Sequence, residues 1–183
     1  MFSRISLVAS MVAVTASMFV ADDAQAQQVG GVVMIPAVSG ALGPSIPVSS
    51  DVTMDTQFSF DARAGVMMIG GSEAQFTFIP QLGYAYDGVG ANLATLTPTI
   101  GVGWPMLGYV TYQPEVMVGS LDRGETAEGG ATFGMRNSVG FHGFANAFFV
   151  DVGHQFLTMP EGLHHSVVVS AGADVAGLVM AFI

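Results

Sequence analysis

The feature that most constrains this chain is a long alternation of apolar residues with small or polar ones, which begins at Gln57 and continues to Asp174. Successive side chains of a β-strand point to opposite faces, so a period of two predicts strands with one apolar and one polar or small face. Three segments show it best, each with a proline near its middle: 78–84, 96–102 and 112–118. Seven clear strands of about ten residues follow from the pattern, with one weaker strand before them.

The first residues carry the pattern of a secretory signal. Arg4 gives a positive start, residues 5–20 are mostly apolar, and Ala24-Gln25-Ala26 is a small-x-small cleavage site. We therefore expect residues 1–26 to be removed, with Gln27 as the first residue of the mature chain. Residues 27–55 form an N-terminal segment with a possible first strand at 32–38, and residues 56–183 carry the remaining strands of one barrel domain.

The composition indicates where the apolar faces point. The chain is 51% hydrophobic and only 10% charged, against about 25% charged residues in a typical soluble domain. So little charge covers a water-exposed surface poorly, whereas strands whose apolar face meets lipid do not need it. A net charge of −10 argues against binding nucleic acid, and the absence of cysteine excludes disulfides and thiolate metal sites. We expect no cofactor.

With these features, residues 32–183 resemble the small outer-membrane β-barrel proteins of bacteria, of the eight-stranded OmpA/OmpX-like class. The resemblance rests on the signal, the two-residue period, Phe182 near the C-terminus and aromatic residues near strand ends: Tyr84, Tyr86, Trp104 and Tyr109. It implies an all-β fold, a single antiparallel up-and-down transmembrane barrel of eight strands in the outer membrane. It further implies two partners, outer-membrane lipid and the barrel assembly machinery, and we expect a monomer.

Two aspects of the strand assignment stay open. Several residues are expected to break regular structure after residue 35: Pro36, Gly40, Gly43, Pro44 and Pro47. The eighth strand is therefore either 32–38 or, in the alternative register, 178–183. With residues 32–38 as the first strand, most of the longer connections lie at one end of the barrel. Pro80, Pro98 and Pro114 cannot donate to a strand ladder, so a bulge or kink at one level of the wall is expected to accommodate them.

The polar faces collect six charged residues: Asp61, Arg63, Glu115, Arg136, Asp151 and Asp174. Inside a narrow barrel such charges are tolerated only when they are paired. We interpret them as a structural ion-pair plug in the lumen. The alternative is a proton or cation site, because two arginines face four carboxylates.

The triplet His164-His165-Ser166 is a candidate catalytic motif, because strand alternation puts His164 and Ser166 on one face. A histidine beside a serine hydroxyl, oriented by Asp174 or Asp151, is the arrangement of a hydrolase. The triplet is faintly similar to the His-x-Ser of outer-membrane lipid A deacylases. The alternative is a histidine pair at the end of a loop. The same pair, His164 and His165, could bind a metal ion. Because His142 and His154 are scattered along the sequence, we expect no metal site.

Three functions are compatible with these patterns. The first is a non-enzymatic structural or surface-interaction barrel of the outer membrane with a side-chain-filled lumen. The second is a soluble secreted β-barrel that binds a small apolar ligand, in which the apolar faces would line the interior. The third is a membrane-embedded lipid hydrolase that uses His164 and Ser166.

Overall fold

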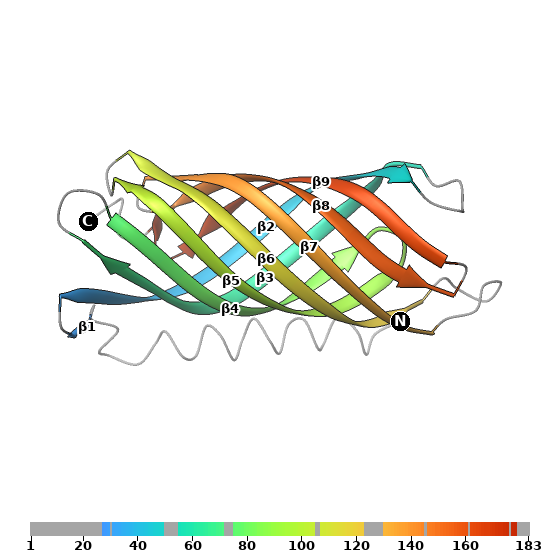
Figure 1. Ribbon diagram of the computed structural model, residues 1–183, viewed down its shortest axis with the longest axis horizontal. Helices are drawn as coiled ribbons and strands as arrows, with labels where there is room; N and C mark the ends of the chain where they lie inside the picture. The colour runs from blue at the N-terminus through green and yellow to red at the C-terminus, as the bar shows by residue number, and fades with distance from the viewer. Residues whose placement is uncertain are drawn as a thin grey trace.

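Eight long strands close into one barrel, and a short ninth strand lies beside them (Figure 1). The computed structural model describes residues 27–29, 31–49, 55–71, 75–104, 107–122, 130–144, 146–160, 162–175 and 177–178. The strands are β1 (Gln27–Val29), β2 (Val32–Ser49), β3 (Gln57–Gly70), β4 (Gln75–Asp87), β5 (Ala91–Trp104), β6 (Gly108–Leu121), β7 (Gly130–Gly143), β8 (Phe148–Met159) and β9 (Gly162–Asp174). Within the described ranges, no helix is long and apolar enough to cross a membrane.

The connectivity is the simplest that closes a barrel. Each long strand pairs antiparallel with the next along the chain, and β9 pairs with β2 to complete the wall. This confirms the predicted all-β, eight-stranded up-and-down barrel. The connections at 50–56, 88–90, 122–129 and 160–161 share one end of the barrel, called the loop end below. The opposite end, where β2 begins and β9 ends, is called the terminal end.

The first strand of the barrel is much longer than the sequence indicated. The expected break after residue 35 is wrong, because β2 runs unbroken from Val32 to Ser49. Its three prolines lie where the β2–β9 ladder is already absent or irregular. The last pair of this ladder joins Ser39 to Asp174, and Pro36 lies beyond it. Pro44 falls where no pair is formed between Leu42 and Ser45, and Pro47 lies at a bulge. A proline does not end a strand when its missing N–H faces such a seam.

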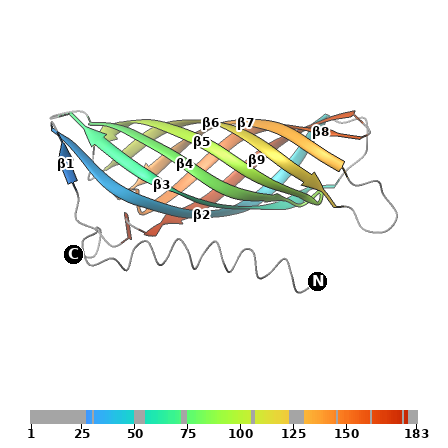
Figure 2. The same ribbon diagram turned by 90° about the horizontal axis from the view of Figure 1, so that it is seen from below.

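The terminal end of β2 has an extra neighbour. Because β9 stops opposite Ser39, residues 32–34 would present an open strand edge, and β1 pairs with these residues (Figure 2). Gly31 in the connecting turn has a φ of 82°, a conformation that glycine adopts without steric cost. The barrel closes through the pairing of β9 with β2, so the first of the two expected strand assignments supplies the eighth strand. Residues 179–183 of the alternative strand lie outside the described residues. Residues 1–26, with the expected signal, and Phe182 lie outside the described residues.

The central prolines lie at one level on neighbouring strands. Pro80 is paired with Pro98, and the register on either side places Pro98 opposite Pro114. The β5–β6 ladder is interrupted there, between the pairs Leu96–Val116 and Ile100–Tyr112. Two opposed prolines can exchange no N–H bonds, so the loss of ladder hydrogen bonds is confined to one level of the wall. The register is the same on either side of this level, so the prolines are accommodated there without the expected bulge.

The tilt of the strands follows from the row of residues that are paired from one strand to the next at the level of these prolines. This row runs from Pro36 around the wall and returns to β2 at Ile46, ten residues further along: Pro36, Val66, Pro80, Pro98, Pro114, Asn137, His154, Val167 and Ile46. With about 4.8 Å between strands and about 3.3 Å per residue, this stagger tilts eight strands by about 40°. Each residue then advances about 2.5 Å along the barrel axis.

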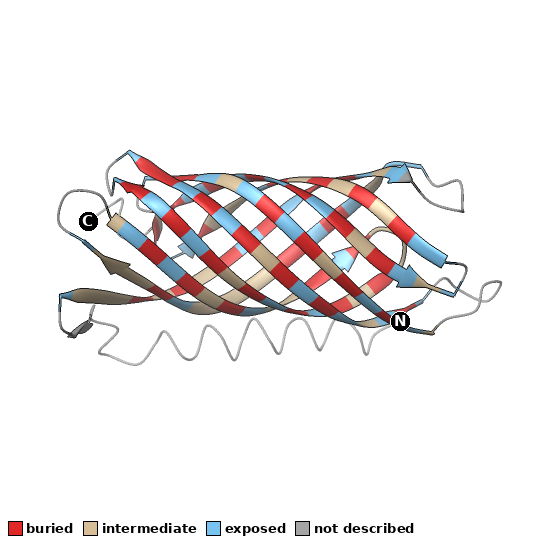
Figure 3. Cartoon of the chain, viewed as in Figure 1, coloured by how far each residue is buried: buried red, intermediate tan, exposed pale blue. Residues whose placement is uncertain are grey.

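The two faces of the wall differ in chemistry as the alternation predicted. Buried and exposed residues alternate along every long ribbon (Figure 3). The large side chains Phe58, Phe78, Val116 and Val150 point outward and are 40–59% exposed. The inner face carries mostly small and polar residues, with two clusters of apolar side chains, and the predicted apolar faces point outward.

Candidate functional site

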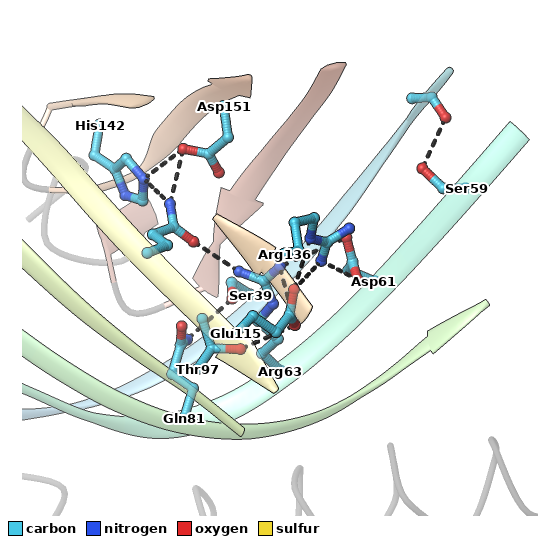
Figure 4. Close-up of polar contacts among 12 residues, drawn as sticks. Ser39, Ser59, Asp61, Arg63, Gln81, Thr97, Glu115, Arg136, His142 and Asp151 are labelled. Carbon is cyan, nitrogen blue, oxygen red and sulfur yellow. Dashed lines mark hydrogen bonds and ion pairs between the residues drawn. The ribbon is translucent and has the colours of Figure 1, made fainter. Parts of the chain in front are cut away.

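Four of the six predicted lumen charges meet in the middle of the barrel (Figure 4). Arg136 on β7 lies between two acids, with Nη2 2.8 Å from Asp61 Oδ1 and Nε 2.6 Å from Glu115 Oε2. Arg63 is more distant, with Nη2 3.6 Å from Asp61 and 3.5 Å from Glu115. Thr97 Oγ1 donates to Glu115 Oε1 at 2.9 Å. Two arginines thus balance two carboxylates, and the group joins β3, β5, β6 and β7 across the lumen.

A second polar cluster continues from this group toward the terminal end. Arg63 Nη1 donates to Gln113 Oε1 at 2.8 Å, and Gln113 Nε2 donates to Asp151 Oδ1 at 2.8 Å. His142 Nε2 lies 3.2 Å from the same Asp151 oxygen, and its Nδ1 lies 2.5 Å from Asn146 Oδ1. The Asn146 oxygen can only accept, so Nδ1 carries a proton. Nε2 is then free to accept from Gln113 or, when protonated, to donate to Asp151.

The sixth predicted charge, Asp174, lies at the C-terminal end of β9. Its Oδ1 accepts the N–H of Gly177 at 3.0 Å. It occupies the same ladder row as Arg63, with Ser39 of β2 between them. Near the loop end, Asp87 accepts a hydrogen bond from Gln155 and another from the N–H of Val89. Acidic side chains therefore lie near each end of the barrel, in addition to those in the central ion-pair group.

Apolar side chains fill the lumen on both sides of the charges. Toward the loop end they form a cluster of Ala85, Ala91, Leu93, Met117, Leu121 and Leu157. On the β2–β4 wall toward the terminal end they form a second cluster of Ile35, Ala37, Met67 and Ile79. Inward glycines make room for large neighbours: a Cβ at Gly140 would overlap the Asp151 carboxylate, and one at Gly172 would overlap the Phe149 ring. This agrees with the tight interior expected from the sequence.

The candidate hydrolase residues are not assembled with an acid. His164 and Ser166 do share the inner face of β9, and both are buried. Asp174 lies ten residues further along the strand, about 33 Å away. Asp151 pairs with Ser170, so it is about 20 Å from His164 along the wall. The Ser166 hydroxyl has no hydrogen-bond partner among the described residues. The structure thus provides no acid–base–hydroxyl relay from the residues proposed for it.

Several polar groups stand on the otherwise apolar outer face. Asn137 and His154 are exposed there. Tyr112 Oη donates to Asn137 Oδ1 at 2.9 Å. His154 contacts His165, whose Nδ1 is 3.3 Å from His154 Nε2. Each of these polar groups has its partner on another strand of the outer face.

The residues that the sequence analysis missed are mostly uncharged. Gln113, His142, Asn146, Asp87 and Gln155 complete the interior networks. For Gln113 and Gln155 the signal was available, because both lie on the polar face of a predicted strand. Asn146 lies in the turn between β7 and β8 with a φ of 74°, where a two-residue period gives no information.

Comparison with known proteins gives no match to this chain among family models, curated proteins or solved structures. What can be stated of its class rests on the geometry: a closed, eight-stranded, antiparallel up-and-down β-barrel whose buried interior contains a central group of two arginines and two carboxylates.

Proposed function

We propose that this chain is an integral β-barrel of the bacterial outer membrane with a structural or surface-interaction role and no enzymatic activity. The observation that carries the proposal is the distribution of charge between the two faces. Seven charged residues lie within the described strands, and all of them point inward: Asp61, Arg63, Asp87, Glu115, Arg136, Asp151 and Asp174. The outer face instead exposes large apolar side chains, among them Leu82 at 68% and Phe76 at 62%.

Such a surface is unfavourable in water and favourable in lipid. Monomeric soluble proteins rarely expose contiguous apolar patches above a few hundred Å², whereas here each of the eight long strands exposes large apolar side chains. The dimensions fit as well. At about 2.5 Å of axial advance per residue, ten residues of each strand cover the apolar band of about 25 Å found in outer-membrane barrels. The long strands have 12 to 18 residues.

The filled lumen supports a structural role rather than transport. Ion pairs occupy the middle of the barrel and apolar clusters lie on both sides of them. The wall would contact outer-membrane lipid, the assembly machinery would insert the chain, and one chain closes its own barrel. Interaction with other molecules would then fall to the loop end, where Asp55 and Asp122 are exposed.

Detergent extraction tests this proposal. We expect the expressed chain to sediment with outer membranes, to resist washing with salt and carbonate, and to enter solution only with detergent. The unheated protein should also migrate differently from the boiled protein on denaturing gels, because a closed barrel binds less detergent than the unfolded chain. A sample unfolded in urea before loading is the control and should migrate as the boiled form. Recovery of the folded chain in a detergent-free aqueous fraction would contradict the proposal.

A further inference from the structure

Two histidines that are eleven positions apart in the sequence meet on the outer wall. His154 on β8 pairs with Val167, and His165 on β9 pairs with Phe156, so the histidines are diagonal neighbours across the β8–β9 ladder. Their rings are stacked at 23° with centroids 5.3 Å apart. The nearest nitrogens, Nδ1 of His165 and Nε2 of His154, are separated by 3.3 Å. Diagonal neighbours on one face of a sheet are within reach of such side chains.

We propose that His154 and His165 bind one divalent transition-metal ion of the imidazole-preferring class, Zn²⁺, Cu²⁺ or Ni²⁺. Tetrahedral zinc holds histidine nitrogens at about 2.0–2.1 Å, which places two ligand nitrogens about 3.3–3.4 Å apart. The observed separation of 3.3 Å already has this value. The two strands therefore present a pair of ligand nitrogens at the required spacing.

The protonation states also permit binding. Without metal, one of the two facing nitrogens donates a hydrogen to the other. Each neutral imidazole carries one proton on either of its two nitrogens. The donating ring can carry its proton on its other nitrogen instead, after which both facing nitrogens have a lone pair available to a metal ion. Binding to the neutral pair thus needs a change of tautomer and no net loss of a proton.

The location leaves the rest of the coordination shell open. His165 is the fourth residue of β9, close to the loop end, and His154 is exposed on the outer face. Water or another small ligand can therefore fill the remaining positions. The described residues contain no group of three or more histidine, aspartate and glutamate side chains suited to a metal. The site is thus a two-histidine site, which the sequence analysis did not expect because it left His154 unpaired. It does not depend on the chain being in a membrane.

The test uses the full chain, purified without a histidine tag and folded in detergent, with Cu²⁺ as the probe. Pulsed electron paramagnetic resonance should detect coupling to the remote nitrogens of two imidazoles in the unaltered protein at one ion per chain. Either His154→Ala or His165→Ala should leave one imidazole and weaken Zn²⁺ binding by at least about tenfold, the change expected when a ligand is lost. Coupling to one imidazole or none in the unaltered protein would overturn the proposal.

His164 provides the matched control. It is adjacent to His165 in the chain, but its ring is buried inside the barrel. His164→Gln should bind Cu²⁺ with the same two-imidazole signal and the same affinity for Zn²⁺. Circular dichroism of each variant checks that the β-sheet content is retained. If His164→Gln loses the signal while it stays folded, and His165→Ala keeps it, the proposed pair is wrong.

Discussion

Replacement of Arg136 by methionine is expected to lower the free energy of unfolding by about 3–5 kcal/mol, because it leaves buried carboxylates without their nearest cation. Asp61 and Glu115 are 2% and 1% exposed, and both are bound directly by Arg136. Arg63 lies more than 3.4 Å from either acid and cannot neutralise both. Urea unfolding of the barrel in lipid vesicles, followed by Trp104 fluorescence, measures the loss. Trp104 is the single tryptophan of the chain.

The control restores charge balance without restoring the arginine. In the double variant Arg136→Met with Asp61→Asn, Arg63 and Glu115 remain as one cation and one anion. We expect it to unfold at a higher urea concentration than Arg136→Met alone, because one unpaired charge has been removed. The exposed Asp55→Asn should leave the transition unchanged. An Arg136→Met variant as stable as the unaltered protein would show that the ion pairs do not support the fold.

An arginine placed at the middle of the outer wall is expected to destabilise the barrel by about 2–4 kcal/mol. Val152 on β8 is suited to this, since it is 51% exposed and pairs with Val139 on the neighbouring strand. In water, Val152→Arg at so exposed a position would change stability by about 0.5 kcal/mol or less. In a bilayer the guanidinium must be moved into hydrocarbon. The measurement is again urea unfolding in vesicles.

Two controls separate the cost of placing a charge in lipid from the cost of losing the valine side chain: an arginine nearer the end of the barrel and a truncation to alanine. Val48 is 64% exposed near the loop end of β2, where water and head groups would reach the wall in the proposed membrane barrel. Val48→Arg should therefore cost only about 0–1 kcal/mol. Val152→Ala measures the effect of truncation without a charge. Equal and small effects of arginine at both positions would contradict a lipid-facing wall.

The period of two predicted the faces of the strands, but register and contacts across the lumen could not be read from it. Alternation assigns Asp61 and Arg136 to the inner face. Their contact, between residues 75 apart, depends on how far the strands are staggered around the barrel. The length of β2 was missed because its prolines were treated as local breakers. Whether Pro44 ends a strand depends on the β2–β9 seam, which is a property of the closed barrel.

The candidate site could likewise be predicted only in part, because the contacts within it also depend on the register of the strands. Six of the seven charged residues in the strands could be predicted, because few charges exist and these six obey the alternation. Which of them pair could not be predicted, and Asp174 lies apart from the central ion pairs near the end of β9. His154 and His165 lie together through a diagonal of the β8–β9 ladder. A shift of the pairing by two residues would separate them in one direction and place them directly opposite each other in the other, so their contact could not be predicted without the register.

The contact between the outer wall and lipid can be measured directly with one tryptophan. In the variant Trp104→Phe with Val139→Trp, the only indole stands near the middle of the outer wall, at a position that is 57% exposed. In vesicles, bromine atoms attached to the middle of the acyl chains should quench its fluorescence, while iodide dissolved in the water should not. Quenching by iodide together with no effect of the brominated lipid would place this surface in water and contradict the membrane-spanning barrel.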